Sequence, residues 1–409
     1  TLIQEAAFKQ CASLEILILP FIGSERGNSG RAQDLFGWIF GLISEENSSF
    51  PGAIQVDQYN YYDRNNKNNI QYRKVYVPST LREVYITDET VIGYGAFSNM
   101  HMLSKVVIAQ DLSFYSDPNH IFEITYGEDD SITGCVLPSQ NSDVYNDLYI
   151  YKDNTYVMPD QTTPLNEVES LESMLDFYSL YVDENIEHMY SYAFSNANGL
   201  LNGFLGMANI SNAEYAFNDC TGMKYCYMPN ATGRQANNMF AYCTSLKRVL
   251  LPDTLTTLGE AAYRWCLNIE YFQTPYLGRD GGSMVTGKRY QETIGYHFST
   301  DERYTGSDTR YYNQHISRYC KYNQIYDNTG WQSARYVPLS FKLVVTQDTL
   351  IQYSSLAQMV ACLTEVYLSD KVTYIGESAF TRSADIKKIG VWDSANHCII
   401  EVKEGEARF

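Results

Sequence analysis

The residue types that most often carry chemistry are few in this chain and follow no catalytic pattern. Catalysis needs a nucleophile with its base, paired carboxylates or a metal, held within hydrogen-bond reach. None of the six histidines stands beside a Gly-x-Ser-x-Gly, His-Glu-x-x-His or phosphate-loop motif, and they share no common spacing. They are His101, His120, His188, His297, His315 and His397. We therefore predict that the chain is not an enzyme.

Two polar clusters could hold a ligand, but a solvated turn explains each of them as well. Residues 128–130 read Glu-Asp-Asp and offer the oxygen ligands that calcium prefers, without the alternating spacing of a preformed calcium loop. The glycine-rich residues 278–282 precede no recognisable helix, which favours a turn. Cys-x-x-Cys pairs are also missing from the sequence. We predict no metal site and no cofactor.

Tyrosine is the most unusual component, with 36 residues in a chain that is 14% aromatic. Tyrosine offers rigid, amphipathic contact area, which binding surfaces favour, but it also suits strands and hydrophobic cores. Both uses stay open from the sequence. If the tyrosine-rich tracts bind a ligand, the candidate residues are Tyr59, Tyr61, Tyr62, Tyr311, Tyr312, Tyr319 and Trp331.

These tracts interrupt a pattern that repeats every 23 residues between residues 194 and 275. An aromatic residue, a cysteine, a large apolar residue and a proline each keep this interval. The cysteine of each copy precedes a short alternating strand, such as the one with Val249 and Leu251, and Pro252 ends that strand because proline cannot donate to the ladder. A period of this length predicts a solenoid, whose units bury their apolar side chains only by stacking on their neighbours.

The aromatic column should form the main hydrophobic seam, since coils that stack at about 4.8 Å bring successive rings into contact. Cysteines beside this column are expected to be small, free packing residues, which Met100 or Ser383 can replace. The predicted seam consists of Phe8, Phe97, Phe194, Phe217, Phe240, Tyr263 and Phe380.

The same phrase recurs at residues 7–20, 92–103 and 372–386, where Ala-Phe is followed three residues later by Cys, Met or Ser. This phrase resembles the BspA-like leucine-rich repeats, a family of bacterial surface proteins. The resemblance implies a mainly β leucine-rich-repeat solenoid with little helix. It also implies a secreted or cell-surface protein that binds host or bacterial surface proteins, or glycans.

The solenoid is expected to span residues 1–409 as one domain, with tyrosine-rich insertions at about 21–77, 127–165 and 277–337. Pro78 and Pro338, which end two insertions, lie 260 residues apart, and this interval indicates a long-range duplication. Each insertion carries apolar elements and should fold onto the solenoid flank as a hairpin or small lobe. Because Thr1 falls inside a repeat, we expect the sequence to be part of a longer chain.

The amino-acid composition also limits the classes of partner that the chain can bind. The net charge of -18 argues against nucleic acid, whose binding requires lysine and arginine at the phosphates. An apolar run of about 18 residues, which a membrane span would need, does not occur. Two alternatives to adhesion remain: a carbohydrate-binding module, and an architectural spacer of a large surface or phage-borne protein.

Overall fold

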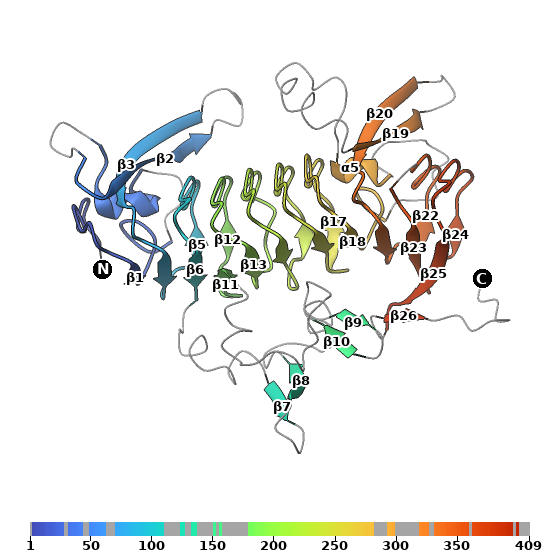
Figure 1. Cartoon of the computed structure of the whole chain (residues 1–409), viewed down its shortest axis with the longest axis horizontal. Helices are drawn as coiled ribbons and strands as arrows, with labels where there is room; N and C mark the ends of the chain where they lie inside the picture. The colour runs from blue at the N-terminus through green and yellow to red at the C-terminus, as the bar shows by residue number, and fades with distance from the viewer. Residues whose placement is uncertain are drawn as a thin grey trace. The chain divides into compact units, whose positions relative to one another are not determined.

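The computed structural model describes residues 2–27, 32–43, 49–62, 70–109, 123–126, 132–136, 150–152, 155–157, 179–281, 293–298, 319–326, 331–359, 362–395 and 398–400. The chain divides into two compact units, Thr1–Ala231 and Thr232–Phe409. In each unit a ladder of short parallel strands forms one side of the stacked coils (Figure 1).

In the first unit, every neighbouring pair of ladder strands is parallel, and Val84 of one strand lies opposite Val106 of the next. The strand order is β1 (Ile16–Leu19), β4 (Glu83–Ile86), β6 (Lys105–Ile108), β11 (Leu180–Val182), β13 (Asn202–Leu205) and β14 (Tyr225–Tyr227). The side chains of β1, β4 and β11 alternate in burial, whereas those of β6, β13 and β14 are mostly buried, and Val84, Val106 and Leu180 are fully buried.

The second unit repeats this arrangement. Its order is β16 (Arg248–Leu250), β18 (Tyr271–Thr274), β21 (Leu343–Thr346), β23 (Glu365–Ser369), β25 (Lys388–Asp393) and β26 (Cys398–Ile400). All neighbours are parallel except the last pair, which is antiparallel. Short parallel pairs elsewhere on the coils complete both units: β5 (Val91–Ile92) with β12 (His188–Met189), β15 (Gly233–Arg234) with β17 (Leu255–Thr257), and β22 (Leu350–Ile351) with β24 (Tyr374–Ile375).

The aromatic seam predicted from the 23-residue spacing is present in both units. In the first unit, the ring centroids of Phe97 and Phe194 lie 5.4 Å apart, and those of Phe194 and Phe217 lie 5.5 Å apart, with interplanar angles of 4° and 2°. In the second unit, Phe240 and Tyr263 stack at 5.6 Å and 3°. All five rings are buried. The coils are therefore in register within each unit, as a leucine-rich-repeat solenoid requires.

The two ends of the predicted seam differ from its centre. Phe8 is half-buried, and its ring centroid lies 6.5 Å from that of Phe40, which belongs to the first insertion and not to a repeat. Phe380 is also half-buried. In the preceding coil, Leu356 takes the seam position, because its amide donates to the Ala379 carbonyl just as the Phe240 amide donates to that of Ala262. One coil before Phe380, the seam thus contains an aliphatic residue that the aromatic spacing did not reveal.

The cysteines of the column beside the seam do more than fill a small space, because their thiols also form hydrogen bonds. The thiol of Cys220 donates to the Phe194 carbonyl oxygen at 3.1 Å, and that of Cys266 to the Phe240 carbonyl at 3.1 Å. Ser383, in the same column, donates its hydroxyl to the Leu356 carbonyl. Each of these side chains therefore ties its coil to the seam residue of the coil before it. The cysteines of this column, Cys11, Cys220, Cys243 and Cys266, form no disulfide in the described structure, as expected.

Each seam residue is flanked by two residues in the left-handed backbone conformation. Around Phe194, Tyr192 has a φ of 59° and Asn196 a φ of 61°, and around Phe380, Ser378 and Arg382 have 62° and 59°. A left-handed conformation costs an L-residue roughly 1–2 kcal/mol. The stacked coils impose this conformation at the same two places whichever side chain is present, so no residue type marks it in the sequence.

The first and last insertions contain antiparallel hairpins, one of the two forms that we predicted. In the first, η1 (Ala32–Asp34) and η2 (Phe36–Phe40) precede the hairpin of β2 (Ala53–Tyr62) and β3 (Ile70–Pro78). In the last, α5 (Gly295–Phe298) precedes the hairpin of β19 (Tyr319–Tyr326) and β20 (Trp331–Pro338). Between them lie the antiparallel pairs β7 (Glu123–Tyr126) with β8 (Ile132–Val136), and β9 (Ile150–Lys152) with β10 (Thr155–Val157). The exact insertion boundaries stay a prediction.

The short helix of each large insertion occupies a coil position in the stack. The Phe8 amide donates to the Ile39 carbonyl at 2.8 Å, and the Phe36 amide donates to the Ala96 carbonyl at 3.0 Å, so η2 bridges the coils of Phe8 and Phe97. Phe36 also continues the seam, with its ring 5.0 Å from that of Phe97.

Helix α5 does the same in the second unit. The Tyr263 amide donates to the His297 carbonyl at 3.0 Å, and the Ile294 amide donates to the Ser355 carbonyl at 3.3 Å. The duplication inferred from the prolines thus includes a turn that keeps the stack continuous across each insertion.

Candidate binding site

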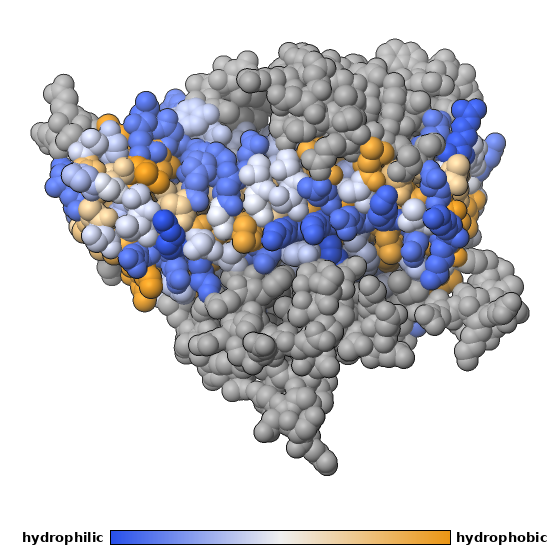
Figure 2. Space-filling model, in the orientation of Figure 1, coloured by the Kyte–Doolittle hydropathy of each residue, from blue (hydrophilic) through white to orange (hydrophobic). Residues whose placement is uncertain are grey.

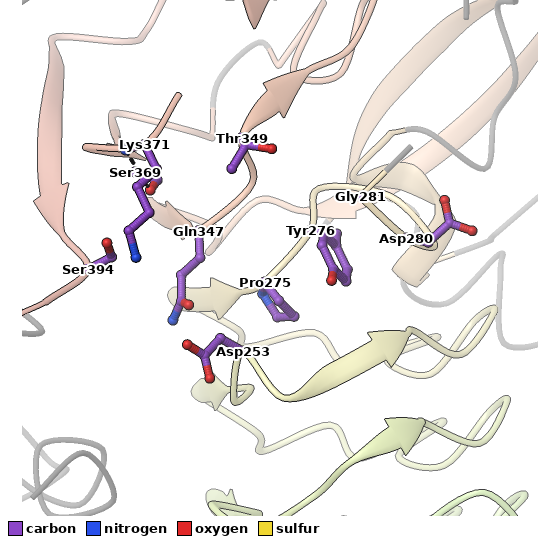
Figure 3. Close-up of a pocket in the computed structure, with 10 residues that line it drawn as sticks. All are labelled: Asp253, Pro275, Tyr276, Asp280, Gly281, Gln347, Thr349, Ser369, Lys371 and Ser394. Atoms are coloured by element: carbon purple, nitrogen blue, oxygen red, sulfur yellow. Dashed lines mark hydrogen bonds between the residues drawn. The ribbon is translucent and has the colours of Figure 1, made fainter. Parts of the chain in front are cut away.

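A cavity of about 680 Å³ opens in the second unit, at the carboxyl ends of its parallel strands (Figure 3). The loops after β16, β18, β21, β23 and β25 all contribute to it. Parallel strands bring these loops to one edge, which is why residues far apart in sequence converge there. The lining residues are Asp253, Pro275, Tyr276, Asp280, Gly281, Gln347, Thr349, Ser369, Lys371 and Ser394.

Hydrogen bonds between successive coils hold these loops in place. The Gln347 amide donates to the Thr274 carbonyl at 3.1 Å, and the Thr373 amide donates to the Thr349 carbonyl at 2.9 Å. The Ser394 hydroxyl donates to Asp370 Oδ1 at 2.6 Å, and this bond lowers the pKa of the Asp370 carboxyl. The cavity is thus built on loops that are fixed to their neighbours.

Tyr276 is the one aromatic residue of the lining. An added Cβ at Gly281 would lie 2.9 Å from Tyr276 Cε1, so glycine allows the backbone to pack closely against this ring. Burial raises the pKa of the phenol, and Asp348, Asp280 and Asp253 raise it further. The hydroxyl therefore stays protonated and able to donate a hydrogen bond at neutral pH.

The charged side chains around the cavity include more carboxylates than cations. Arg279 Nε lies 2.8 Å from Asp280 Oδ2, and this pair is partly exposed. In Figure 3 the Asp280 carboxylate points away from the Tyr276 ring, while Asp253 and Lys371 lie on the other side of it. The lining itself carries two carboxylates, those of Asp253 and Asp280, and one ammonium, that of Lys371, so the site has no surplus of positive charge.

A buried carboxylate anchors the loop that carries Tyr276. Asp348 accepts hydrogen bonds from the Leu277 amide at 3.4 Å and the Leu350 amide at 3.2 Å. Burial raises its pKa to about 7, despite these backbone donors. Glu89 has the same role in the first unit, where its carboxylate accepts from the amides of Ile22 at 3.0 Å and Gly27 at 2.7 Å.

Neither this carboxylate pair nor the cavity was predicted from the sequence. The Glu89 and Asp348 positions lie 259 residues apart, close to the spacing of Pro78 and Pro338, so the duplication could have revealed the pair. Some of the cavity residues keep the repeat spacing, since Asp253 and Tyr276 lie 23 residues apart, as do Lys371 and Ser394. This interval predicts stacked loops but does not indicate a cavity between them.

Of the tyrosines proposed as ligand contacts, the structure describes the side chain of Tyr59 alone. Its ring lies 4.9 Å from that of Tyr72 and 4.7 Å from that of Tyr192, so it packs the hairpin against the solenoid coils. Burial raises the pKa of this half-buried phenol.

The other candidates are described less fully. The backbones of Tyr61, Tyr62, Tyr319 and Trp331 lie in the hairpin strands, and Tyr311 and Tyr312 lie outside the described residues. Binding by any of these tyrosines stays a prediction.

The described histidines are dispersed. His101 is exposed, and Nδ1 of His188 lies 3.0 Å from Asn209 Nδ2. His297 is fully buried in α5, and burial lowers its pKa to about 4. His120, His315, His397 and the cluster at residues 128–130 lie outside the described residues.

Across the described parts of the chain, no group of three His, Cys, Asp or Glu residues could hold a metal ion. The described helices are all too short or too polar to cross a membrane. On the face shown in Figure 2, hydrophilic and hydrophobic residues are interspersed over the described surface.

Comparison with known proteins gives a family match over part of the chain. The family model of the BspA type leucine rich repeat region matches in six copies, over residues 169–278 and 344–399. No curated protein matches the sequence.

Among solved structures, a leucine rich cell surface protein from Faecalibacterium prausnitzii is 14% identical, with a TM-score of 0.27 over 76% of this chain and 60% of that chain. A leucine-rich repeat protein from Bacteroides ovatus is also 14% identical, with a TM-score of 0.28 over 82% and 72%. The chain thus spans less than two thirds of the F. prausnitzii protein. Together with the stacked coils, the family match identifies the repeats within residues 169–278 and 344–399 as BspA-type leucine-rich repeats.

Proposed function

We propose that the chain is a non-enzymatic binding module of a secreted or cell-surface protein, which recognises host or bacterial surface proteins or glycans. Leucine-rich repeats suit this role because they present many loops from a fixed scaffold. The cavity at the strand ends is the observation that carries the proposal. Its side chains converge from five loops that coil-to-coil hydrogen bonds already hold in position.

Such pre-organisation favours binding, since little conformational entropy is lost when a ligand docks on loops that are already ordered. The cavity offers hydroxyl, amide, carboxylate and ammonium groups beside one aromatic ring. These groups can fix the orientation of a ligand by hydrogen bonds. Recognition without turnover is the function that this arrangement supports best.

Biolayer interferometry tests the proposal directly. The full chain is immobilised and exposed to mucin, to purified extracellular-matrix proteins and to whole bacteria, and saturable binding to at least one of them is expected. The acid-denatured chain serves as the control. If the folded chain binds none of these partners saturably, the architectural spacer becomes the better explanation.

A further inference from the structure

The cavity of the second unit has the size and composition of a small-molecule site. Its volume of about 680 Å³ falls within the range of roughly 300–1,000 Å³ that is typical of such pockets. An apolar corner is formed by Pro275 and the ring of Tyr276, and the rest of the lining is polar. The ligand should therefore have one apolar face and many hydrogen-bonding groups.

The hydrogen-bonding groups are of mixed kind. Gln347 can donate and accept through one amide, and Thr349 carries a hydroxyl that can do both. Asp253 accepts only, and Lys371 donates only. A ligand whose hydroxyls each donate and accept satisfies such a set better than one that carries acceptors alone.

The charge balance selects among polyhydroxylated ligands. Arg279 pairs with Asp280 at the cavity rim, and the lining itself carries the carboxylates of Asp253 and Asp280 and one ammonium, that of Lys371. A strongly anionic ligand would meet two carboxylates with no surplus of cations, which disfavours sulfated or sialylated sugars.

From these observations we infer that the cavity binds a neutral oligosaccharide, with the Tyr276 ring against the apolar face of one sugar unit. Gln347, Thr349, Asp253 and Lys371 would hydrogen-bond its hydroxyls. This inference rests on the proposed binding function and names the site and the ligand class.

Saturation-transfer difference NMR on the full chain tests the ligand class. The neutral probes are cellotetraose, maltotetraose, xylotetraose and N-acetyllactosamine, and the anionic probes are sialyllactose and a sulfated disaccharide. At least one neutral probe should give a saturation-transfer signal, and the anionic probes should give none. Silence of all neutral probes, or binding of the anionic ones alone, would overturn the inference.

Substitutions then test the site. Tyr276→Ala should weaken binding of the neutral probe about tenfold or more, as loss of a central aromatic anchor does. Tyr276→Phe, which keeps the ring, should lose less. Tyr374→Ala is the matched control, because Tyr374 is 42% exposed in the same unit and lies outside the cavity lining. It should bind as the unmodified chain does.

Two further variants keep the test decisive if Tyr276→Ala fails to fold. Gln347→Ala and Lys371→Met change half-buried or exposed side chains, and each should weaken binding severalfold in a chain with an unchanged melting temperature. Full binding by both folded variants would refute the cavity as the site. If the chain binds mucin or a matrix protein but no free saccharide, the inference fails while the proposed function stands.

Discussion

Removal of one ring from the centre of the seam tests the physical basis of the fold. Phe194 is fully buried and stacks on both Phe97 and Phe217. A buried Phe→Ala change costs about 3–5 kcal/mol through lost burial and the cavity that remains. Two stacked pairs, each worth about 0.5–1.5 kcal/mol beyond burial, place Phe194→Ala at the upper end of that range. Phe240→Ala in the second unit should also cost about 3–5 kcal/mol.

Urea unfolding followed by far-UV circular dichroism measures this cost as a shift of the midpoint. Leu201→Ala is the control, because Leu201 is 41% exposed and its truncation should change the free energy of unfolding by about 0.5 kcal/mol or less. Phe194→Leu should fall between the two. If Phe194→Ala matches Leu201→Ala within about 1 kcal/mol, which is below the smallest expected core effect, the seam is not the main source of stability.

Three further predictions concern a buried base, the thiols and the backbone. Because burial lowers the pKa of His297 to about 4, below the ordinary 6.5, the folded chain should lose stability as pH falls from 6.5 to 4. The loss approaches about 3 kcal/mol. In a plot of melting temperature against pH, His297→Phe should therefore flatten the part between pH 6.5 and 4. If the variant keeps the slope of the unmodified chain there, His297 is not the cause of the loss. Iodoacetamide should label the exposed Cys11 in the native chain and leave Cys220 unmodified, because burial raises the pKa of the Cys220 thiol to about 12. Peptide mass spectrometry measures the extent of labelling at each cysteine. Equal modification of both would refute the burial of Cys220. Arg382 has a positive φ, so Arg382→Gly should raise the free energy of unfolding by about 0.5–1 kcal/mol, because glycine adopts the left-handed conformation freely. Thr381 has no positive φ, so Thr381→Gly should lower the free energy of unfolding. If calorimetry ranks the two variants in the reverse order, the coils do not impose backbone strain at Arg382.

Much of the fold follows from spacing. Stacked coils place equivalent residues in contact, so a constant interval in the sequence becomes a ring contact in space, as for Phe194 and Phe217. The same logic fails where a coil has no aromatic residue. Leu356 therefore escaped notice, although its backbone bonds are those of a seam residue.

The site could not be predicted in this way. Tyr276, Gln347 and Lys371 each belong to a loop whose sequence is ordinary for a turn, and only the stacking of strands brings them to one cavity. The tyrosine content drew attention to the hairpins instead. There the described ring, Tyr59, has aromatic neighbours on the hairpin and on the coils. An abundance of one residue type indicates packing as readily as recognition.

The turns at Phe36–Phe40 and Gly295–Phe298 have a consequence for how such proteins vary. The short helix of each large insertion forms the backbone hydrogen bonds that a repeat coil would form, so the coils on either side of it keep their usual partners. The hairpin that follows can then lengthen, shorten or change its sequence without a gap in the scaffold beneath it. Changes in the hairpins therefore need not disturb the stacked coils, whose contacts stabilise the fold.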